Sequence, residues 1–207
     1  MKKFLAQRNI SITSFDYFIL VNSFFFLLMC IFVYYNRFIG YRGAANIHEF
    51  FIYATVIFFI IFVSWYKFRY LNIKTSLLIL IEIGILMHFS GAFIQVDGHR
   101  LYDSRFFEIR FDKYVHFVNA LIATIVTLYI FNKRKLPQTG FMLMIAILLV
   151  LGLGAVNEMI EYVVTLTVEH NGVGAYNNNM LDLVANFFGA IAATLLFKFA
   201  IKDYIID

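Results

Sequence analysis

Charged residues, cysteine and proline are all scarce in this chain of 207 residues. Only 14% of the residues are charged and 62% are hydrophobic, whereas soluble domains contain about 25% charged and roughly 45–50% apolar residues. This apolar surplus, which includes 26 Phe and 13 Tyr, is more than one soluble core can bury, so it excludes a soluble domain. The single cysteine, Cys30, excludes an intramolecular disulfide, and the single proline, Pro137, falls in a predicted loop.

The net charge of +4 does not indicate nucleic-acid binding, because the lysine and arginine residues lie at the ends of the apolar runs, where membrane topology places them. A haem is not indicated either. Its axial ligands would be paired histidines at helical spacing within the apolar runs, and the five histidines do not have that spacing. Membrane lipids are the expected partners, while the sequence leaves a protein partner and the oligomeric state open.

The apolar residues fall into six runs, each of a length that can cross a bilayer as a helix, which takes roughly 17–25 residues. This pattern predicts an all-α integral membrane protein, a bundle of six transmembrane helices in one domain, residues 1–207. The predicted spans cover residues 17–35, 50–66, 75–96, 112–131, 141–167 and 181–200. The polar segments between them, including 36–49, 97–111 and 169–180, are predicted loops.

The distribution of positive charge predicts how these spans are oriented. The two termini and the second and fourth loops carry 11 of the 17 lysine and arginine residues. Loops with such an excess lie in the cytoplasm, so we expect both termini to be cytoplasmic. The first span is too long for the core of a signal peptide and no small-residue cleavage pattern follows it, so we expect it to be retained.

Ionisable residues cluster at the outer ends of three predicted spans, where such residues are energetically costly and indicate function. Each of these spans carries two polar residues three or four positions apart, which places both on one helix face. The pairs are Asp112 and His116, Glu158 and Glu161, and Asp182 and Asn186. Because all three pairs are predicted at the same depth and on the same side, we expect them to surround one cavity.

This cluster permits two kinds of chemistry. Carboxylates and an imidazole on facing helices can bind a divalent metal ion, such as Mg, Mn, Ca or Zn, as a cofactor. Crowded carboxylates can instead leave an acid and a base side by side, with His116 as a general base or nucleophile. The candidate catalytic residues are Asp112, His116, Glu158, Glu161 and Asp182, of which the last four are also the candidate metal ligands. The candidate substrate-binding residues are Arg110, Lys113, Asn178 and Asn186.

A purely structural role for the cluster is the alternative. Lys113 would then pair with Glu158 or Glu161, and Asp182 would cap the last helix. Gly189 would allow close helix packing, as small residues do in membranes. Four acids and a histidine exceed what one structural ion pair needs, and this excess favours a ligand-binding or catalytic site.

Polar residues outside the cluster are expected to have structural roles. His88, within the third predicted span, is expected to be an interior residue with its hydrogen bonds satisfied. Tyr102 and the charged residues around it are expected to form a solvated cap at the outer mouth. The three asparagines at positions 177–179 are expected to form a turn, although they could offer oxygen atoms to a head group.

Three motifs carry a resemblance to known proteins. An Asp-Lys-x-x-His-Phe segment starts at Asp112, a glycine-rich helix ends at Glu161, and an Asp-x-x-x-Asn-x-x-Gly segment starts at Asp182. Between residues 102 and 194 the chain thereby resembles the VanZ-like membrane proteins and the uncharacterised YjdF-like bacterial inner-membrane proteins. The resemblance implies a multi-pass protein of the bacterial inner (plasma) membrane, in the cell envelope, and it defines no reaction.

These observations leave two functional hypotheses. The first is an envelope enzyme, a hydrolase or transferase with or without a metal ion, that acts on a lipid or lipid-linked head group at the outer leaflet. The second is a non-enzymatic module that binds a lipid, an ion or a partner protein. A small transporter is disfavoured, because transport sites tend to lie at the membrane midplane between repeats, whereas this cluster lies at one edge.

Overall fold

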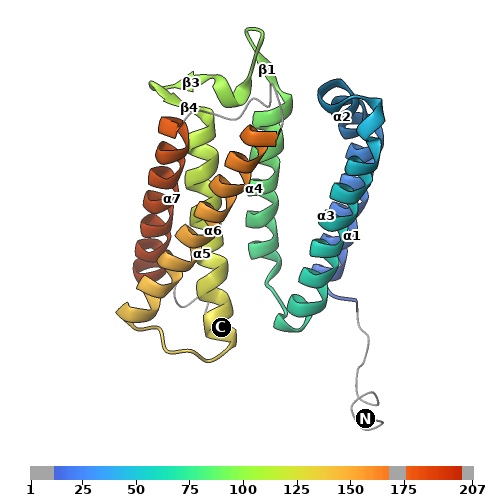
Figure 1. Ribbon diagram of the computed structural model, residues 1–207. Helices are drawn as coiled ribbons and strands as arrows, with labels where there is room; N and C mark the ends of the chain where they lie inside the picture. The colour runs from blue at the N-terminus through green and yellow to red at the C-terminus, as the bar shows by residue number, and fades with distance from the viewer. Residues whose placement is uncertain (1–11, 168–175, 202–207) are drawn as a thin grey trace, which may run out of the picture. The chain divides into compact units, whose positions relative to one another are not determined.

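The structure is a computed structural model that describes residues 12–167 and 176–201 (Figure 1). Within these residues, six helices are long and apolar enough to cross a membrane, which confirms the predicted all-α, multi-pass fold. The six candidate spans are Ser14–Gly40, Ala44–Leu71, Thr75–Phe93, Phe111–Lys133, Gly140–Leu166 and Tyr176–Ile201. The chain divides into two compact units, Met1–Leu78 and Ile79–Asp207.

The N-terminal unit contains two long helical segments. Helix α1 (Ser14–Met29) continues through the π-helical segment η2 (Cys30–Tyr34) into α2 (Tyr35–Arg42). The 3₁₀ segment η3 (Ala44–Asn46), α3 (Ile47–Phe68) and the 3₁₀ segment η4 (Arg69–Leu71) follow. Most of the predicted loop 36–49 is therefore helical, and that prediction is wrong. Polar residues end the apolar run there, but the helix continues until Gly43, whose φ of +78° ends it in the manner of a glycine C-cap.

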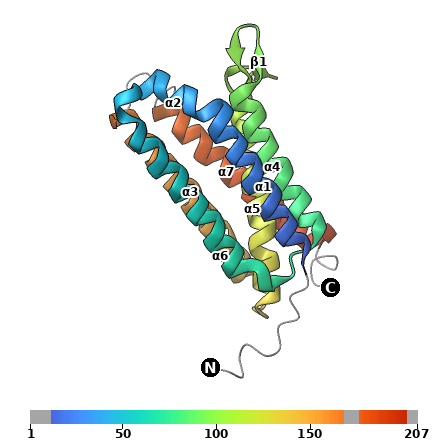
Figure 2. The ribbon, with the colours of Figure 1, turned by 90° about the vertical axis from the view of Figure 1, so that its right-hand side faces the viewer.

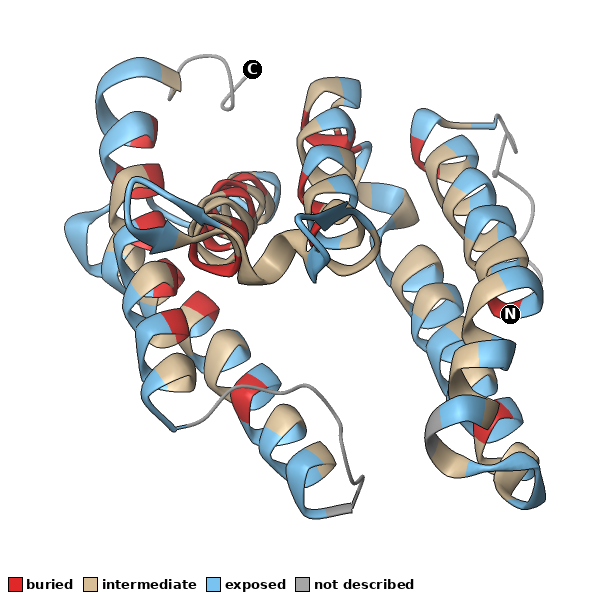
Figure 3. Ribbon diagram, turned by 90° about the horizontal axis from the view of Figure 1, so that it is seen from above, coloured by how far each residue is buried: buried red, intermediate tan, exposed pale blue. Residues whose placement is uncertain are grey.

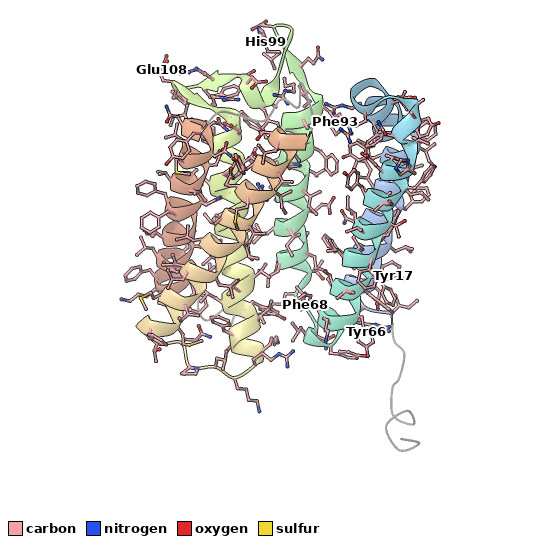
Figure 4. The ribbon with its side chains drawn as sticks, in the orientation of Figure 1. Tyr17, Tyr66, Phe68, Phe93, His99 and Glu108 are labelled. Atoms are coloured by element: carbon pink, nitrogen blue, oxygen red, sulfur yellow. The ribbon has the colours of Figure 1, made fainter. Side chains whose placement is uncertain are left out.

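Asp16 ties the start of α1 to the end of α3. Thr13 and Asp16 form a capping box, in which each side chain accepts a hydrogen bond from the backbone N–H of the other. The Asp16 carboxylate also accepts from Trp65 Nε1 at 2.7 Å and lies 2.9 Å from Arg69 Nε. Three exposed aromatic residues lie at this end of the unit, as in the aromatic belts of membrane proteins, namely Tyr17, Tyr66 and Phe68 (Figure 4).

The C-terminal unit contains α4, α5, α6 and α7 with two short β-hairpins between α4 and α5. The hairpin segment consists of β1 (Gln95–Val96), β2 (His99–Arg100), the 3₁₀ turn η5 (Leu101–Asp103), β3 (Arg105–Phe106) and β4 (Ile109–Arg110). The helices are α4 (Thr75–Phe93), which begins before the unit boundary, α5 (Phe111–Lys133), α6 (Gly140–Thr167), and α7 (Tyr176–Leu196), which the π-helical segment η6 (Phe197–Ile201) extends.

The hairpins replace the unstructured loop predicted over 97–111, and they end the third span at Phe93 rather than at residue 96. Each hairpin turn consists of two residues that both have positive φ, Asp97–Gly98 in the first and Phe107–Glu108 in the second. Two-residue turns of this kind match the natural twist of the paired strands. His99 and Glu108, labelled in Figure 4, mark the two hairpins at one end of the unit.

Helix α5 packs against both α6 and α7 and forms the centre of the unit (Figure 1, Figure 2). Together α5 and α7 carry the largest shares of buried residues among the six candidate spans (Figure 3). A Cβ atom added at Gly189 on α7 would lie 2.2 Å from the carbonyl oxygen of Phe117 on α5, so the two backbones meet at a place where only glycine fits. This contact agrees with the packing role expected for Gly189.

Helix α7 begins at Tyr176, five positions before the predicted start of the last span. The asparagines at 177–179 therefore lie in its first turn, and the prediction of a turn at these positions is wrong. The reason lies in tertiary contacts. Lys113 and Arg110 both donate hydrogen bonds to the side-chain oxygen of Asn178 and hold it within the helix. The remainder of the predicted loop, residues 169–175, lies outside the described residues.

Candidate functional site

A cavity of about 700 Å³ lies in the C-terminal unit, between α4, α5, α6, α7 and the hairpin segment. Its lining is polar near the hairpins and becomes apolar further along the helices. Seven predicted site residues line it, namely Arg110, Asp112, His116, Glu161, Asn178, Asp182 and Asn186. The other two, Lys113 and Glu158, are buried and contact or adjoin this lining. The structure therefore brings all nine predicted residues to one end of the unit.

Lys113 joins α5 to α7 through a buried cation. Its Nζ atom donates to Asp182 Oδ1 at 2.6 Å and to Asp112 Oδ2 at 3.1 Å. It also donates to the backbone oxygen and the side-chain oxygen of Asn178. The predicted pairing of Lys113 with Glu158 or Glu161 is wrong, because an extended Lys113 side chain at the start of α5 reaches α7 and its acids rather than α6.

Asp182 is 1% exposed and uses both of its carboxylate oxygens. Oδ1 accepts from Lys113 and lies 3.4 Å from His116 Nε2, while Oδ2 accepts from the Asn178 amide at 3.0 Å. The predicted helix-capping role is wrong, because α7 begins at Tyr176 and Asp182 lies well inside it. Asp182 instead bonds Lys113 and Asn178 and lies beside the imidazole of His116, which is one turn inside α5 and borders the cavity.

Glu158 and Glu161 are one turn apart on α6, but their environments differ. Glu161 lines the cavity and accepts a hydrogen bond from the Asn157 amide at 3.1 Å. Glu158 is only 6% exposed, and neither of its carboxylate oxygens has a hydrogen-bond partner among the described residues. One oxygen of Glu158 lies within 4.8 Å of ligand atoms of both His116 and Asp182. Of these two glutamates, Glu161 thus has a hydrogen-bond donor, whereas Glu158 has none among the described residues.

Arginine side chains at the rim connect the hairpins to α7. Arg110 donates to Asp103 and, at 2.8 Å, to the side-chain oxygen of Asn178. Arg100 pairs with the same Asp103 at 3.0 Å. Asp112 lies 3.9 Å from Arg110, and its second oxygen, Oδ1, is buried with no hydrogen-bond partner among the described residues. The rim therefore places two guanidinium groups beside a cavity that is lined on its inner side by carboxylates.

Tyr102 was expected in a solvated cap, and the structure places it instead in the cavity wall, where its hydroxyl bonds Nδ1 of His88. Burial, followed by the nearby charges of Asp112 and Glu161, raises the pKa of Tyr102 above its usual range. The hydroxyl thus stays protonated, and its hydrogen bond with His88 Nδ1 agrees with the satisfied interior role expected for that histidine. The sequence places Tyr102 near the mouth but does not identify its partner, because the contact joins two separate elements.

The arrangement has the features of a reactive or ligand-binding centre. An imidazole lies beside a buried carboxylate, a second buried carboxylate nearby has no donor among the described residues, and a third lines the adjoining space. Such groups can bind a proton or a cation. Each is energetically costly in an apolar helix, and this cost indicates a function. The atoms of His116, Glu158 and Asp182 are close enough together to share one ion.

Six apolar helices, with a partly polar cavity between four of them, define a multi-pass α-helical membrane protein. Comparison with known families places the chain more closely. It belongs to the DUF2238 family, described as "Predicted membrane protein (DUF2238)", which it matches over residues 17–203. Comparison with curated proteins and with solved structures finds no significant match.

Proposed function

We propose that this protein is an enzyme of the bacterial inner membrane that hydrolyses or transfers the polar head group of a lipid or lipid-linked substrate. The observation that carries the proposal is the grouping of His116, Glu158 and Asp182 beside a cavity that is polar at one end and apolar at the other. His116 and its two carboxylate neighbours form the reactive end of the site. Glu161, which lines the cavity, is the further acid–base group.

The shape and lining of the cavity support an amphipathic substrate. Its apolar part is formed by Ala120, Ala123, Val150 and Leu153, which lie one or two helical turns from the polar groups. A lipid head group would therefore meet the charged end while the first part of its chain lies against apolar side chains. Pockets of a few hundred cubic ångströms with few, well-placed polar groups are typical of small-molecule sites, for which the range is roughly 300–1,000 Å³.

The rim supports a negatively charged or phosphate-bearing head group. Arg110 and Arg100 are the cations at the mouth, and guanidinium groups bind phosphate through paired hydrogen bonds. Asn178 offers an amide group at the same place, and Asn186 offers another deeper in the cavity. The likeness of residues 102–194 to VanZ-like and YjdF-like proteins supports a role in the cell envelope.

The test compares purified full-length variants incubated with a polar lipid extract of bacterial membranes, with the products measured by mass spectrometry. We expect the wild type to convert a lipid head group and His116→Ala to convert none, with both proteins melting at similar temperatures. His116→Gln, which keeps a hydrogen-bonding side chain, should also be inactive. The matched control is His99→Ala, on an exposed hairpin residue, which should behave as the wild type (Figure 4). Equal turnover by His116→Ala would overturn the proposal.

The non-enzymatic alternative also rests on an observation. Lys113 and Asp182 are saturated by internal bonds, as in a network that only shapes a binding cavity. A binding protein would retain a lipid through purification and leave it chemically unchanged. That result with the wild type would replace the enzymatic proposal with the binding one.

The outer-leaflet position of the site has its own test. Phe107, at the tip of the second hairpin, is 95% exposed, and Gln138 lies in the loop at the opposite ends of α5 and α6. In a Cys30→Ser background, Phe107→Cys should react with an impermeant thiol reagent in intact cells. Gln138→Cys should react only after the membrane is permeabilised. The reverse pattern would place the cavity at the cytoplasmic leaflet.

A further inference from the structure

The unsatisfied carboxylate of Glu158 is the starting point for a more specific inference about this site. The side chain is 6% exposed, and neither oxygen meets a hydrogen-bond donor among the described residues. A buried carboxylate without a partner is strongly unfavourable, and proteins place such groups where they bind a proton, a metal ion or another charge. Glu161, one turn away, has the Asn157 amide as a donor, so of these two glutamates only Glu158 lacks a partner among the described residues.

The geometry around Glu158 suits one metal ion. A carboxylate oxygen of Glu158, a ring nitrogen of His116 and a carboxylate oxygen of Asp182 all lie within 4.8 Å of one another. Imidazole and carboxylate ligands bind zinc at about 2.0–2.2 Å in tetrahedral geometry, so two ligand atoms of one ion lie roughly 3.4 Å apart. The three atoms must therefore move closer together by about an ångström to share one ion.

The charge balance of the cluster also favours a cation. Asp112, Glu158, Glu161 and Asp182 bring four carboxylates to this end of the cavity. Lys113 lies among them, and Arg110 is shared between this group and Asp103. With all four carboxylates ionised, negative charge would be in excess by about two, which is the charge that one divalent ion neutralises.

The donor set selects a class of ion. One imidazole nitrogen with two carboxylate oxygens suits a first-row divalent metal such as Zn²⁺ or Mn²⁺, whereas Ca²⁺ prefers oxygen ligands only and a larger number of them. Lys113 Nζ donates to Asp182 Oδ1 and would share this residue with a bound ion. It also has acceptors on Asp112 and Asn178, which it can keep when the ion binds.

We propose that His116, Glu158 and Asp182 bind one first-row divalent ion, Zn²⁺ or Mn²⁺, and that Glu161 is not a ligand. This inference rests on the proposed function in taking the cavity as the place where the head group binds. An ion at this position polarises a head-group oxygen or a water molecule and supplies the charge stabilisation that the surrounding carboxylates cannot. It also requires the imidazole of His116 to be neutral.

Metal binding is tested on the purified full chain in detergent after treatment with a chelator. Zn²⁺ or Mn²⁺ is added, the protein is desalted, and bound metal is measured by elemental analysis and, for Mn²⁺, by electron paramagnetic resonance. We expect one ion per chain in the wild type and in Glu161→Gln. Glu158→Gln and His116→Ala should bind at least about tenfold more weakly, because each loses a direct ligand.

The paired glutamate variants keep the proposal falsifiable, because both make the same carboxylate-to-amide change on one helix. Equal binding by Glu158→Gln and the wild type, or no ion bound by the wild type, overturns the metal site. The lipid assay repeated with chelator separates the two proposals. Turnover that persists in the presence of chelator would overturn the metal site and leave the proposed enzymatic function intact. Ion binding without lipid turnover would overturn the enzymatic function and leave the metal site intact.

Discussion

Asp16 in the N-terminal unit and Glu158 in the C-terminal unit are both acidic residues within apolar helices, yet their surroundings differ. Asp16 accepts hydrogen bonds on both oxygens, from Thr13, Trp65 and Arg69. Glu158 accepts none from the described residues and is more deeply buried. In the first case the charge is fully used in joining two helices. The carboxylate of Glu158 instead keeps unused hydrogen-bonding capacity, which a ligand can use.

The same contrast separates the ion pairs of the two units. In the N-terminal unit, one arginine, Arg42, pairs with one acid, Glu49, at 3.0 Å. Lys113 instead serves two acids, and a third and fourth acid lie close by. A structural role needs matched charges, so an excess of one sign in a buried position distinguishes a candidate site from a structural pair.

Replacing Lys113 is expected to have the largest effect on stability. Lys113→Met leaves Asp112 and Asp182 buried without their cation, and we expect a loss of about 3–5 kcal/mol in the free energy of unfolding. The measurement is chemical denaturation of the purified protein in detergent. Arg105→Met is the control, because Arg105 lies on an exposed hairpin strand, and it should change stability by less than about 0.5 kcal/mol.

A second change tests whether Glu158 is kept for function at the expense of stability. Glu158→Gln removes an unpartnered buried charge, so the metal-free protein should become more stable by about 1–3 kcal/mol while it loses activity. Thermal melting in the presence of chelator measures the first effect. A clear loss of stability would show that Glu158 has a structural partner, as Asp16 does.

The matching change in the N-terminal unit should have the opposite sign. Asp16→Ala removes the capping box and the contacts to Trp65 and Arg69, so we expect a loss of about 1–2 kcal/mol without any effect on lipid turnover. Asp97→Asn, at the exposed turn of the first hairpin, is the control for removing an acid, because asparagine tolerates the positive φ of that position. A loss of turnover in Asp16→Ala at normal stability would contradict the division of roles between the two units.

The smallest expected effect concerns Tyr102. Tyr102→Phe removes one hydrogen bond to His88 and should lower stability by about 1 kcal/mol. Because folding raises the pKa of Tyr102, the folded protein holds this proton more tightly than the unfolded chain does. Its contribution to stability is therefore complete below pH 10 and is lost as the pH rises toward the folded-state pKa. Denaturation between pH 8 and pH 11 should show an alkaline decline that is smaller in Tyr102→Phe.

The lengths of the apolar runs predicted the six helices, and helical periodicity predicted that each polar pair lies on one helix face. Residues three or four positions apart share a helix face, so the paired acids and His116 had to point the same way once their helices were adjacent. The partner of each residue was not predictable in this way. Lys113 has a long side chain with several reachable acids, and the packing of α5 against α7 decides which of them it meets.

The connecting segments show a second limit. Asp97–Gly98 is a sequence typical of a two-residue hairpin turn, so the sequence does carry a signal for the first hairpin. Phe107–Glu108 adopts the same backbone conformation without any such signal. The start of α7 was missed because asparagines favour turns in isolation, whereas here bonds from Arg110 and Lys113 to Asn178 override that preference.

The backbone contact between Gly189 and Phe117 has a mechanical consequence for access to the cavity. Sliding α7 along α5 by one turn would bring Ala185 or Ala193 to the place of Gly189, and the Cβ of either would collide with the Phe117 carbonyl. The two helices are thus expected to move as one rigid piece that carries His116 and Asp182 together. A lipid that diffuses sideways in the bilayer would then enter the cavity past the other elements that line it, which are α4, α6 and the hairpin segment.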